Sequence, residues 1–241
     1  MEIRGKVHCF FEQSGTFKNE FKKLGYEAED YDIQDNFGET DHVTDLFREI
    51  ETAYNDGGGC SVFDRITPND LIVAFFPCIY FTGQKMADFM LSKHGTEKWT
   101  LARKADYAIK QATERLRFHT LLYKLVSIVD TRNLRLVIEN PYTSTYLKYN
   151  FLRPQVIDMN RMERGDFFRK PTAYWFIGCK PTYGFSRQND KKQKLITKCK
   201  RAPRAGLCSE ECSMISPDYA RNWICDFVLG KDQHLEPTLF D

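Results

Sequence analysis

Short apolar segments alternate with helical patterns along most of the chain, and this alternation limits the possible fold more than any other feature. Residues 71–76 (Leu-Ile-Val-Ala-Phe-Phe) include no polar side chain, which is typical of a strand covered on both faces. We expect further strands at residues 6–11, 27–33, 134–138 and 173–179, and helices at residues 16–24, 43–54, about 96–129 and 217–229. The sequence therefore predicts an α/β fold, with a mostly parallel sheet and helices on both faces.

The chain length favours a single domain with a small appendage. A chain of 241 residues can form one sizeable hydrophobic core. Residues 184–214 are mostly polar, basic and weakly patterned, so we interpret them as a small excursion from a domain formed by residues 1–183 and 215–241.

The sequence has no feature of a membrane or secreted protein. No stretch approaches the roughly 20 apolar residues that cross a bilayer. The charged start at residues 1–6 leads directly into an expected strand, which argues against a secretory signal. The cysteines are scattered, so we expect reduced thiols and a cytoplasmic location. A zinc site is conceivable at Cys199, Cys208, Cys212 and Cys225, but these lack the Cys-x-x-Cys spacing of a zinc knuckle, and we expect no metal.

A basic segment at residues 191–204 indicates a nucleic-acid partner. The net charge of the chain is only +2, yet this segment holds seven lysines and arginines and no acid. Such a cluster can neutralise phosphates and bind DNA without sequence preference. A solvated, mobile loop explains the same composition equally well.

Candidate ligand-binding residues follow the first two expected strands, because parallel sheets bind ligands beyond the carboxyl ends of their strands. Residues 10–17 turn into a helix N-terminus, whose backbone amides can approach a ligand, although a plain strand-to-helix turn fits at least as well. Asp32 follows the turn by about 20 residues, where an acid commonly binds ribose hydroxyls or caps a helix. Asp45 fits either an acid at a helix N-terminus or an adenine contact.

Two potentially reactive side chains follow the third and fourth expected strands. Cys78 comes directly after residues 71–76 and Pro77, where a thiolate could attack an electron-poor ring carbon. A buried structural cysteine is the other interpretation. Glu139 is costly to bury unpaired, so we expect it to hold a proton, to bind a substrate ring nitrogen, or to cap a helix. Parallel strands would direct both side chains toward one cleft.

The order of these motifs resembles the DNA cytosine carbon-5 methyltransferase family. Residues 11–16 are similar to its cofactor turn, and Pro77-Cys78 and Glu139-Asn140 resemble its nucleophile loop and its Glu-Asn pair. Arg169-Lys170 resembles its basic motif for target base and phosphate, and residues 216–220 resemble its last motif, beside the cofactor. The resemblance assigns Cys78, Glu139 and Arg169 to catalysis, and it assigns cofactor binding to Phe11, Glu12, Ser14, Gly15, Thr16, Asp32, Asp45 and Pro77.

The resemblance implies a class I methyltransferase-like Rossmann fold, S-adenosylmethionine as cofactor and DNA as substrate. Cys78 would add to carbon 6 of a flipped-out cytosine, and Glu139 would bind ring nitrogen 3 and the exocyclic amine while carbon 5 is methylated. Arg169 would activate the thiol or hold the base. The short stretch 184–214 replaces a full recognition domain, as in compact bacterial and phage variants linked to restriction-modification. A phage-encoded protein would act in the host cell cytoplasm.

Two other functions remain open from the sequence. Glu12 and Gln13 replace the Ala and Gly that the family favours in its cofactor turn, which favours a degenerate protein that binds nucleic acid or a partner without turnover. The missing recognition domain favours an enzyme that modifies free pyrimidine nucleotides or adds a group other than methyl.

Overall fold

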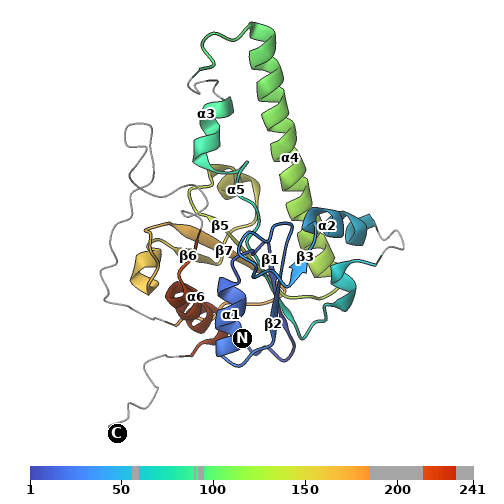
Figure 1. Cartoon of the computed structure of the whole chain (residues 1–241), viewed down its shortest axis with the longest axis vertical. Helices are drawn as coiled ribbons and strands as arrows, with labels where there is room; N and C mark the ends of the chain where they lie inside the picture. The colour runs from blue at the N-terminus through green and yellow to red at the C-terminus, as the bar shows by residue number, and fades with distance from the viewer. Residues whose placement is uncertain (56–59, 90, 92–94, 185–213, 232–241) are drawn as a thin grey trace.

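The computed structural model describes residues 1–55, 60–89, 91, 95–184 and 214–231 (Figure 1). In chain order the strands are β1 (Val7–Phe10), β2 (Ala28–Asp32), β3 (His42–Val43), β4 (Leu71–Ala74), β5 (Leu136–Pro141), β6 (Val156–Asp158) and β7 (Thr172–Ile177). The α-helices are α1 (Thr16–Lys23), α2 (Leu46–Asn55), α3 (Met86–Phe89), α4 (Leu101–Thr131), α5 (Thr145–Asn150) and α6 (Pro217–Trp223). Short 3₁₀ turns lie at Val62–Arg65, Gly83–Lys85 and Arg161–Arg164, and a π-helical turn at Ile224–Leu229 continues α6.

The strands of the described residues form one seven-stranded sheet in the order β3-β2-β1-β4-β5-β7-β6. Strands β1 to β5 pair in parallel, whereas β7 is antiparallel to both β5 and β6. The structure therefore confirms the prediction of an α/β fold with a mostly parallel sheet.

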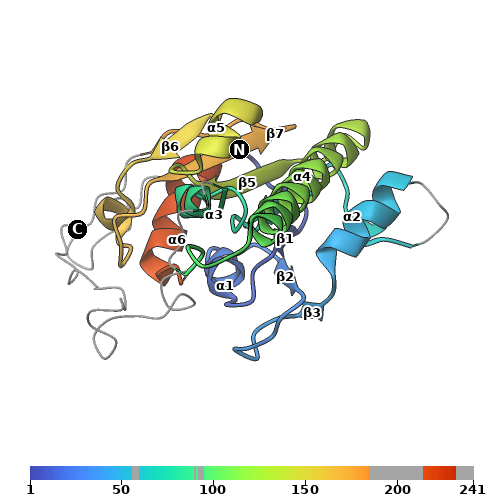
Figure 2. The ribbon, with the colours of Figure 1, turned by 90° about the horizontal axis from the view of Figure 1, so that it is seen from above.

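Each face of the sheet is covered by its own set of helices. Leu71 and Val73 of β4 pack in one hydrophobic cluster with α1 and α6, and Ile72 and Ala74 pack in the other with α2 and α4. Helices α1 and α6 lie side by side, away from α2 (Figure 2). Because both faces of β4 are buried, the strand contains only apolar residues.

Helix α4 extends well beyond the core. Thr100 caps the N-terminus of the helix, because its Oγ1 accepts a hydrogen bond from the backbone N–H of Arg103 at 3.3 Å. Its buried residues lie at Phe118 and beyond, apart from Gln111. The part before Phe118 rises past the sheet (Figure 1). Among the described residues, no helix combines the length and the apolar character that a membrane crossing requires.

The observed elements differ from the sequence prediction in three respects. Val43 belongs to the edge strand β3, and the helix predicted at residues 43–54 begins at Leu46. Strand β5 continues to Pro141 because β7 pairs with it along its full length, so Glu139 lies inside the strand and not after it. The prediction also missed β3 and β6, which have two and three residues and therefore no detectable periodicity.

A buried lysine joins α1 to the loop that follows β2. The Lys18 ammonium is 3.1 Å from the carboxylate of Asp30 and 3.2 Å from that of Asp41, and it also donates a hydrogen bond to the carbonyl of Glu39. Only 3% of Lys18 is exposed, so its removal would leave the buried Asp30 carboxylate without its cation.

We therefore predict that Lys18→Ala lowers the free energy of unfolding by about 3–5 kcal/mol. Lys22→Ala is the matched control, because its ammonium lies 3.8 Å from the same Asp41 carboxylate but is half exposed. Such an exposed pair contributes about 0–1 kcal/mol. Urea unfolding of both variants measures the difference, and equal midpoints would show that the buried pair is unimportant for stability.

Candidate active site

Two adjoining cavities lie at the carboxyl ends of the parallel strands. The first has a volume of about 230 Å³, and its lining includes Cys78, Glu139 and Lys170. The second has a volume of about 360 Å³ and is lined by Phe11, Asp32, Ile33, Gln34, Asp45, Leu46, Phe47, Phe75 and Pro77. The linings of the two cavities share Phe11, Asp32, Phe75 and Pro77, so the cavities lie directly beside each other.

The structure brings Cys78 and Glu139 to the same cavity from neighbouring strands. Ala74 of β4 pairs with Ile138 of β5, so the loop after β4 and the end of β5 reach one edge of the sheet. Cys78 is half-buried and free, and Glu139 is buried. Burial, followed by the nearby carboxylate of Glu139, raises the pKa of the Cys78 thiol. Burial also raises the pKa of Glu139, which favours a protonated carboxyl group.

Lys170 supplies a positive charge beside both groups. It lines the first cavity, and its charge opposes the rise in pKa at Cys78 and at Glu139. Arg169, the basic residue that the sequence assigned to catalysis, is exposed and does not line either cavity. Lys170, the second residue of the same basic motif, therefore lies at the cavity two residues before β7, and the catalytic role of Arg169 stays a prediction.

Three hydrogen bonds hold the loop that carries Cys78. The side-chain amide of Asn140 donates to the carbonyl of Phe76 at 2.8 Å, and the Ser144 hydroxyl donates to the carbonyl of Phe81 at 2.8 Å. From α4, the Nε of Arg115 donates to the carbonyl of Tyr80 at 2.9 Å. The loop is thus anchored on both sides of Cys78, which fixes the thiol relative to β5. The motif resemblance includes Asn140 but gives no indication that its side chain anchors this loop.

Behind Glu139, a buried arginine provides a second cation that sequence reasoning missed. Arg161 is 1% exposed; its Nη2 lies 2.5 Å from Asp166, and its Nη1 lies 3.9 Å from Glu139. Its guanidinium also stacks on the ring of Tyr219, 4.5 Å from the ring centroid. Because Asp166 is the closer partner, Arg161 only partly compensates the charge of an ionised Glu139.

The turn after β1 uses its own glutamate to satisfy the start of α1. Gly15 has φ 64°, a left-handed conformation that suits glycine, and Phe11 also has a positive φ of 59°. The buried Glu12 carboxylate accepts hydrogen bonds from the backbone N–H groups of Phe17 at 2.7 Å and Lys18 at 3.3 Å. These amides are therefore bound internally and are not free for a ligand. Burial raises the pKa of Glu12 to about 7, against the lowering effect of both amides.

The other residues of the predicted cofactor site fall into two groups. Glu12, Ser14, Asp32 and Pro77 line the first cavity with Phe11, whereas Gly15 and Thr16 line neither cavity. Asp32 accepts the backbone N–H of Gln34 at 2.8 Å, and burial raises its pKa. Asp45 accepts the N–H of Phe47 at 3.0 Å, so it caps α2 while also lining the second cavity.

Parts of the sequence prediction lie outside the described residues. The basic segment 191–204 and Cys199, Cys208 and Cys212 belong to the stretch 185–213, which the structure does not describe. Cys225 is buried in the core. Within the described ranges, no group of His, Cys, Asp and Glu side chains is arranged to hold a metal ion.

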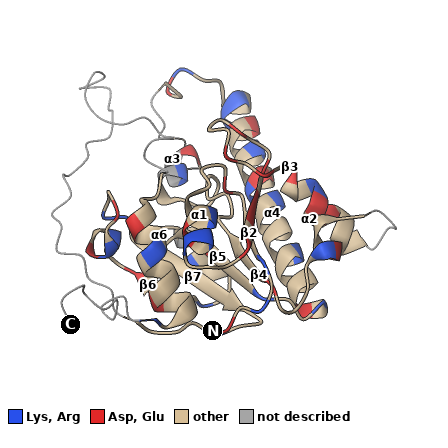
Figure 3. Cartoon of the chain, turned by 60° about the horizontal axis from the view of Figure 1, so that its bottom comes forward, with Lys and Arg blue, Asp and Glu red and all other residues tan. Residues whose placement is uncertain are grey.

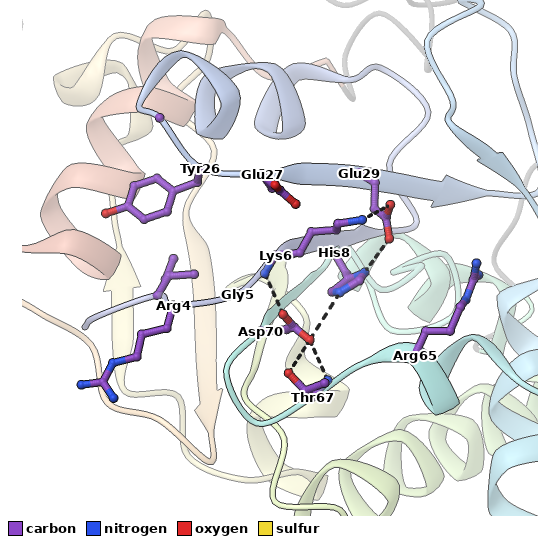
Figure 4. A pocket seen from close by; sticks show the side chains of 12 residues that line it. Arg4, Gly5, Lys6, His8, Tyr26, Glu27, Glu29, Arg65, Thr67 and Asp70 are labelled. Atoms are coloured by element: carbon purple, nitrogen blue, oxygen red, sulfur yellow. Dashed lines mark hydrogen bonds and ion pairs between the residues drawn. The ribbon is translucent and has the colours of Figure 1, made fainter.

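A further cavity, of about 680 Å³, opens at the amino ends of β1, β2 and β4 (Figure 4). His8 lies at its base, with Nδ1 3.1 Å from Glu29 and Nε2 4.0 Å from Asp70. Burial alone would raise the pKa of Glu29, but hydrogen bonds from Tyr31, Lys6 and His42 hold it at about 2. Lys6, His8, Glu29 and Asp70 are held to one another by ion pairs and hydrogen bonds, and the cavity lies at the opposite ends of the strands from Cys78, so we place no chemistry in it.

Comparison of the chain with models of known protein families finds no match, and comparison with curated protein sequences finds none either.

We predict that Glu12 makes the fold less stable as the pH rises toward neutrality. An ordinary glutamate titrates near 4.5, and Glu12 in the folded protein titrates at about 7. Between these values the unfolded chain has lost the proton that the folded protein keeps, so the unfolding free energy falls by about 3 kcal/mol and then levels off. Glu12→Gln keeps the size and the acceptor oxygen but does not ionise.

Urea unfolding of wild type and Glu12→Gln from pH 4.5 to 8 isolates this contribution, because all other titrating groups cancel in the difference. The variant should gain stability relative to wild type across this interval. A difference that does not change with pH would contradict the burial of an ionisable Glu12.

A second prediction concerns the activation of Cys78. Lys170→Gln should raise the pKa of the Cys78 thiol further, since the thiolate loses its neighbouring cation. Arg169→Gln is the matched control and should leave that pKa unchanged, because Arg169 is exposed and outside the cavity. The measurement is the pH dependence of iodoacetamide labelling at Cys78, read by peptide mass spectrometry. A larger shift of the Cys78 pKa in the Arg169→Gln variant would instead favour Arg169 as the activating residue.

Proposed function

We propose that this protein transfers a methyl group from S-adenosylmethionine to carbon 5 of cytosine in DNA, through a covalent adduct with Cys78. One observation carries the proposal: Cys78, Glu139 and Lys170 line a single cavity, which adjoins a second cavity lined by Asp32 and Asp45. A thiol, a protonatable carboxyl group and a cation around one space are the groups that addition to a pyrimidine ring requires.

The fold supports the same proposal. A parallel sheet with the order 3-2-1-4-5-7-6 and an antiparallel β7 is the strand arrangement of the class I methyltransferase-like fold that the motif resemblance implies. Fold alone does not identify an activity, so this similarity only adds to the argument from the site.

The second cavity suits the nucleoside part of the cofactor. Asp32, at the end of β2, can accept hydrogen bonds from the ribose hydroxyls, and the apolar side chains of Ile33, Phe47 and Pro77 can enclose a purine ring. When bound, S-adenosylmethionine supplies an electrophilic methyl group on a sulfonium. The shared wall at Phe75 and Pro77 would direct that group toward the cavity of Cys78.

The side chains of the first cavity account for the steps on the base. A flipped-out cytosine would place carbon 6 at Cys78, and the thiolate sulfur would form a bond to it. Protonated Glu139 would donate a hydrogen bond to ring nitrogen 3 and accept one from the exocyclic amine. The hydrogen bond to nitrogen 3 draws electron density from the double bond between carbons 5 and 6, which favours the addition at carbon 6. Carbon 5 would then take the methyl group while the sulfonium sulfur leaves as a neutral thioether. A water molecule would accept the proton of carbon 5, and expulsion of the Cys78 thiolate would restore the double bond between carbons 5 and 6.

A binding protein without turnover is the second candidate, favoured by one specific observation. Glu12 occupies the amides at the start of α1, which reduces the number of donors available to a cofactor in that turn. Binding of S-adenosylmethionine measured by calorimetry separates the two functions, because only the methyltransferase requires it.

The decisive experiment incubates the protein with methyl-labelled S-adenosylmethionine and mixed-sequence duplex DNA, followed by identification of the labelled base. We expect 5-methylcytosine. Cys78→Ser should abolish transfer while the cofactor still binds, and Glu139→Gln should reduce the rate by about 10²–10⁴-fold. Cys60→Ser is the control for cysteine replacement, since Cys60 is exposed and outside both cavities.

Duplex DNA containing 5-fluorocytosine tests the covalent step directly. Carbon 5 of this base carries fluorine in place of the hydrogen that must be lost as a proton, so the covalent adduct should persist. Peptide mass spectrometry should then detect it on Cys78. Label in free pyrimidine nucleotides but not in DNA would favour a nucleotide-modifying enzyme. Normal methyl transfer by Cys78→Ser would overturn the proposed mechanism.

A further inference from the structure

The projecting half of α4, residues 101–117, is almost entirely outside the core. The whole helix has 31 residues and a length of about 46 Å. In its first half only Gln111 is buried, and Leu101, Ile109 and Leu116 are exposed. Among the described residues, this stretch buries one side chain fully and leaves most of its surface exposed, so it can contact another molecule.

The projecting half carries an excess of positive charge. It holds five basic residues against two acidic ones, and segments coloured for Lys and Arg recur along it (Figure 3). Arg103, Lys110 and Arg117 follow one another at intervals of seven residues, which places them in one row along the helix. Lys110 is exposed; Arg103 lies over the ring of Trp99, 4.4 Å from its centroid, and Arg117 is 3.5 Å from Glu114.

The helix is also joined to the loop that carries Cys78. Arg115 donates its hydrogen bond to the carbonyl of Tyr80, and the rings of Tyr80 and Phe118 contact each other with centroids 4.8 Å apart. The residues before Arg115 therefore extend outward from the part of α4 that contacts this loop.

We propose that the projecting half of α4 is a duplex-DNA-binding arm, in which the row of Arg103, Lys110 and Arg117 contacts the phosphate backbone. Residues 101–117 span about 25 Å, comparable to about seven base pairs at roughly 3.4 Å each. The arm holds the duplex beside the cavity into which a base is flipped. This inference rests on the proposed function and assigns the DNA contact to described residues, independently of the segment 191–204.

The test uses the full chain and a fluorescein-labelled duplex of mixed sequence, with binding followed by anisotropy between roughly 50 and 200 mM salt. The variant Arg103→Gln/Lys110→Gln/Arg117→Gln should bind at least about tenfold more weakly. Its slope of log affinity against log salt should be smaller by about 2–3, one unit for each lost phosphate contact. Circular dichroism should be unchanged, because these side chains are outside the core.

The matched control Arg4→Gln/Lys22→Gln/Lys23→Gln removes the same charge at the other edge of the molecule. Arg4 lines the cavity at the amino ends of the strands, and Lys22 and Lys23 are at the end of α1. The control should keep the wild-type slope. Equal losses of duplex affinity in both variants would show that only the net charge matters, and would overturn the proposed DNA-binding arm.

The exposed Ile109 and Leu116 define the competing outcome, in which the helix binds a second copy of this chain. Sedimentation showing a dimer that Ile109→Ser/Leu116→Ser dissociates, with duplex affinity unchanged in the triple Gln variant, would overturn the proposal. The DNA-binding role of the arm and the proposed methyl transfer can be rejected independently of each other. Duplex binding that depends on the arm, without any methyl transfer, rejects only the proposed function, and methyl transfer with unchanged binding in the triple variant rejects only the arm.

Discussion

The parallel pairing of β4 with β5 is the constraint on which the proposed active site depends. The register of Ala74 with Ile138 brings the loop after one strand and the end of the next to a single edge of the sheet. Asn140 then fixes the loop by bonding to the carbonyl of Phe76, one residue before Pro77. A shift of one residue in this register would turn Glu139 to the opposite face, so the site and the packing of both hydrophobic clusters are determined together.

The protonation states of Cys78 and Glu139 depend on their burial and on the few positive charges near them. Burial favours the neutral forms of both Cys78 and Glu139, and Lys170 is the described cation that lines the same cavity. Arg161 lies behind, committed mainly to Asp166. A protonated carboxyl group suits hydrogen bonding to a pyrimidine nitrogen, whereas the thiol needs help to ionise. Lys170 lowers the pKa of both groups, so it favours the thiolate, whereas burial is what keeps the Glu139 carboxyl group protonated.

The sequence predicted the buried parts of the fold and failed where long-range geometry decides. Residues 71–76 identified a central strand because no polar side chain can be tolerated there, and the Phe17 and Phe21 spacing identified α1. The two-residue β3 and three-residue β6 carry no periodicity. Which of Arg169 and Lys170 lines the cavity depends on the exact path of the chain before β7, and the role of Glu12 depends on how the turn folds back onto α1. Residue types at strand ends indicated the chemistry, but not which neighbour faces the cavity.

The anchoring of the Cys78 loop by Asn140 and Ser144 has a consequence for protein synthesis. A ribosome makes the chain from the N-terminus, so the thiol emerges well before the two side chains that fix its loop and before Lys170. A nascent chain that ends before β5 contains the nucleophile without the partners that position it. The arrangement that the proposed addition to a base requires is therefore completed late, when most of the domain has already been translated, and prematurely terminated products would hold an ordinary, unpositioned thiol.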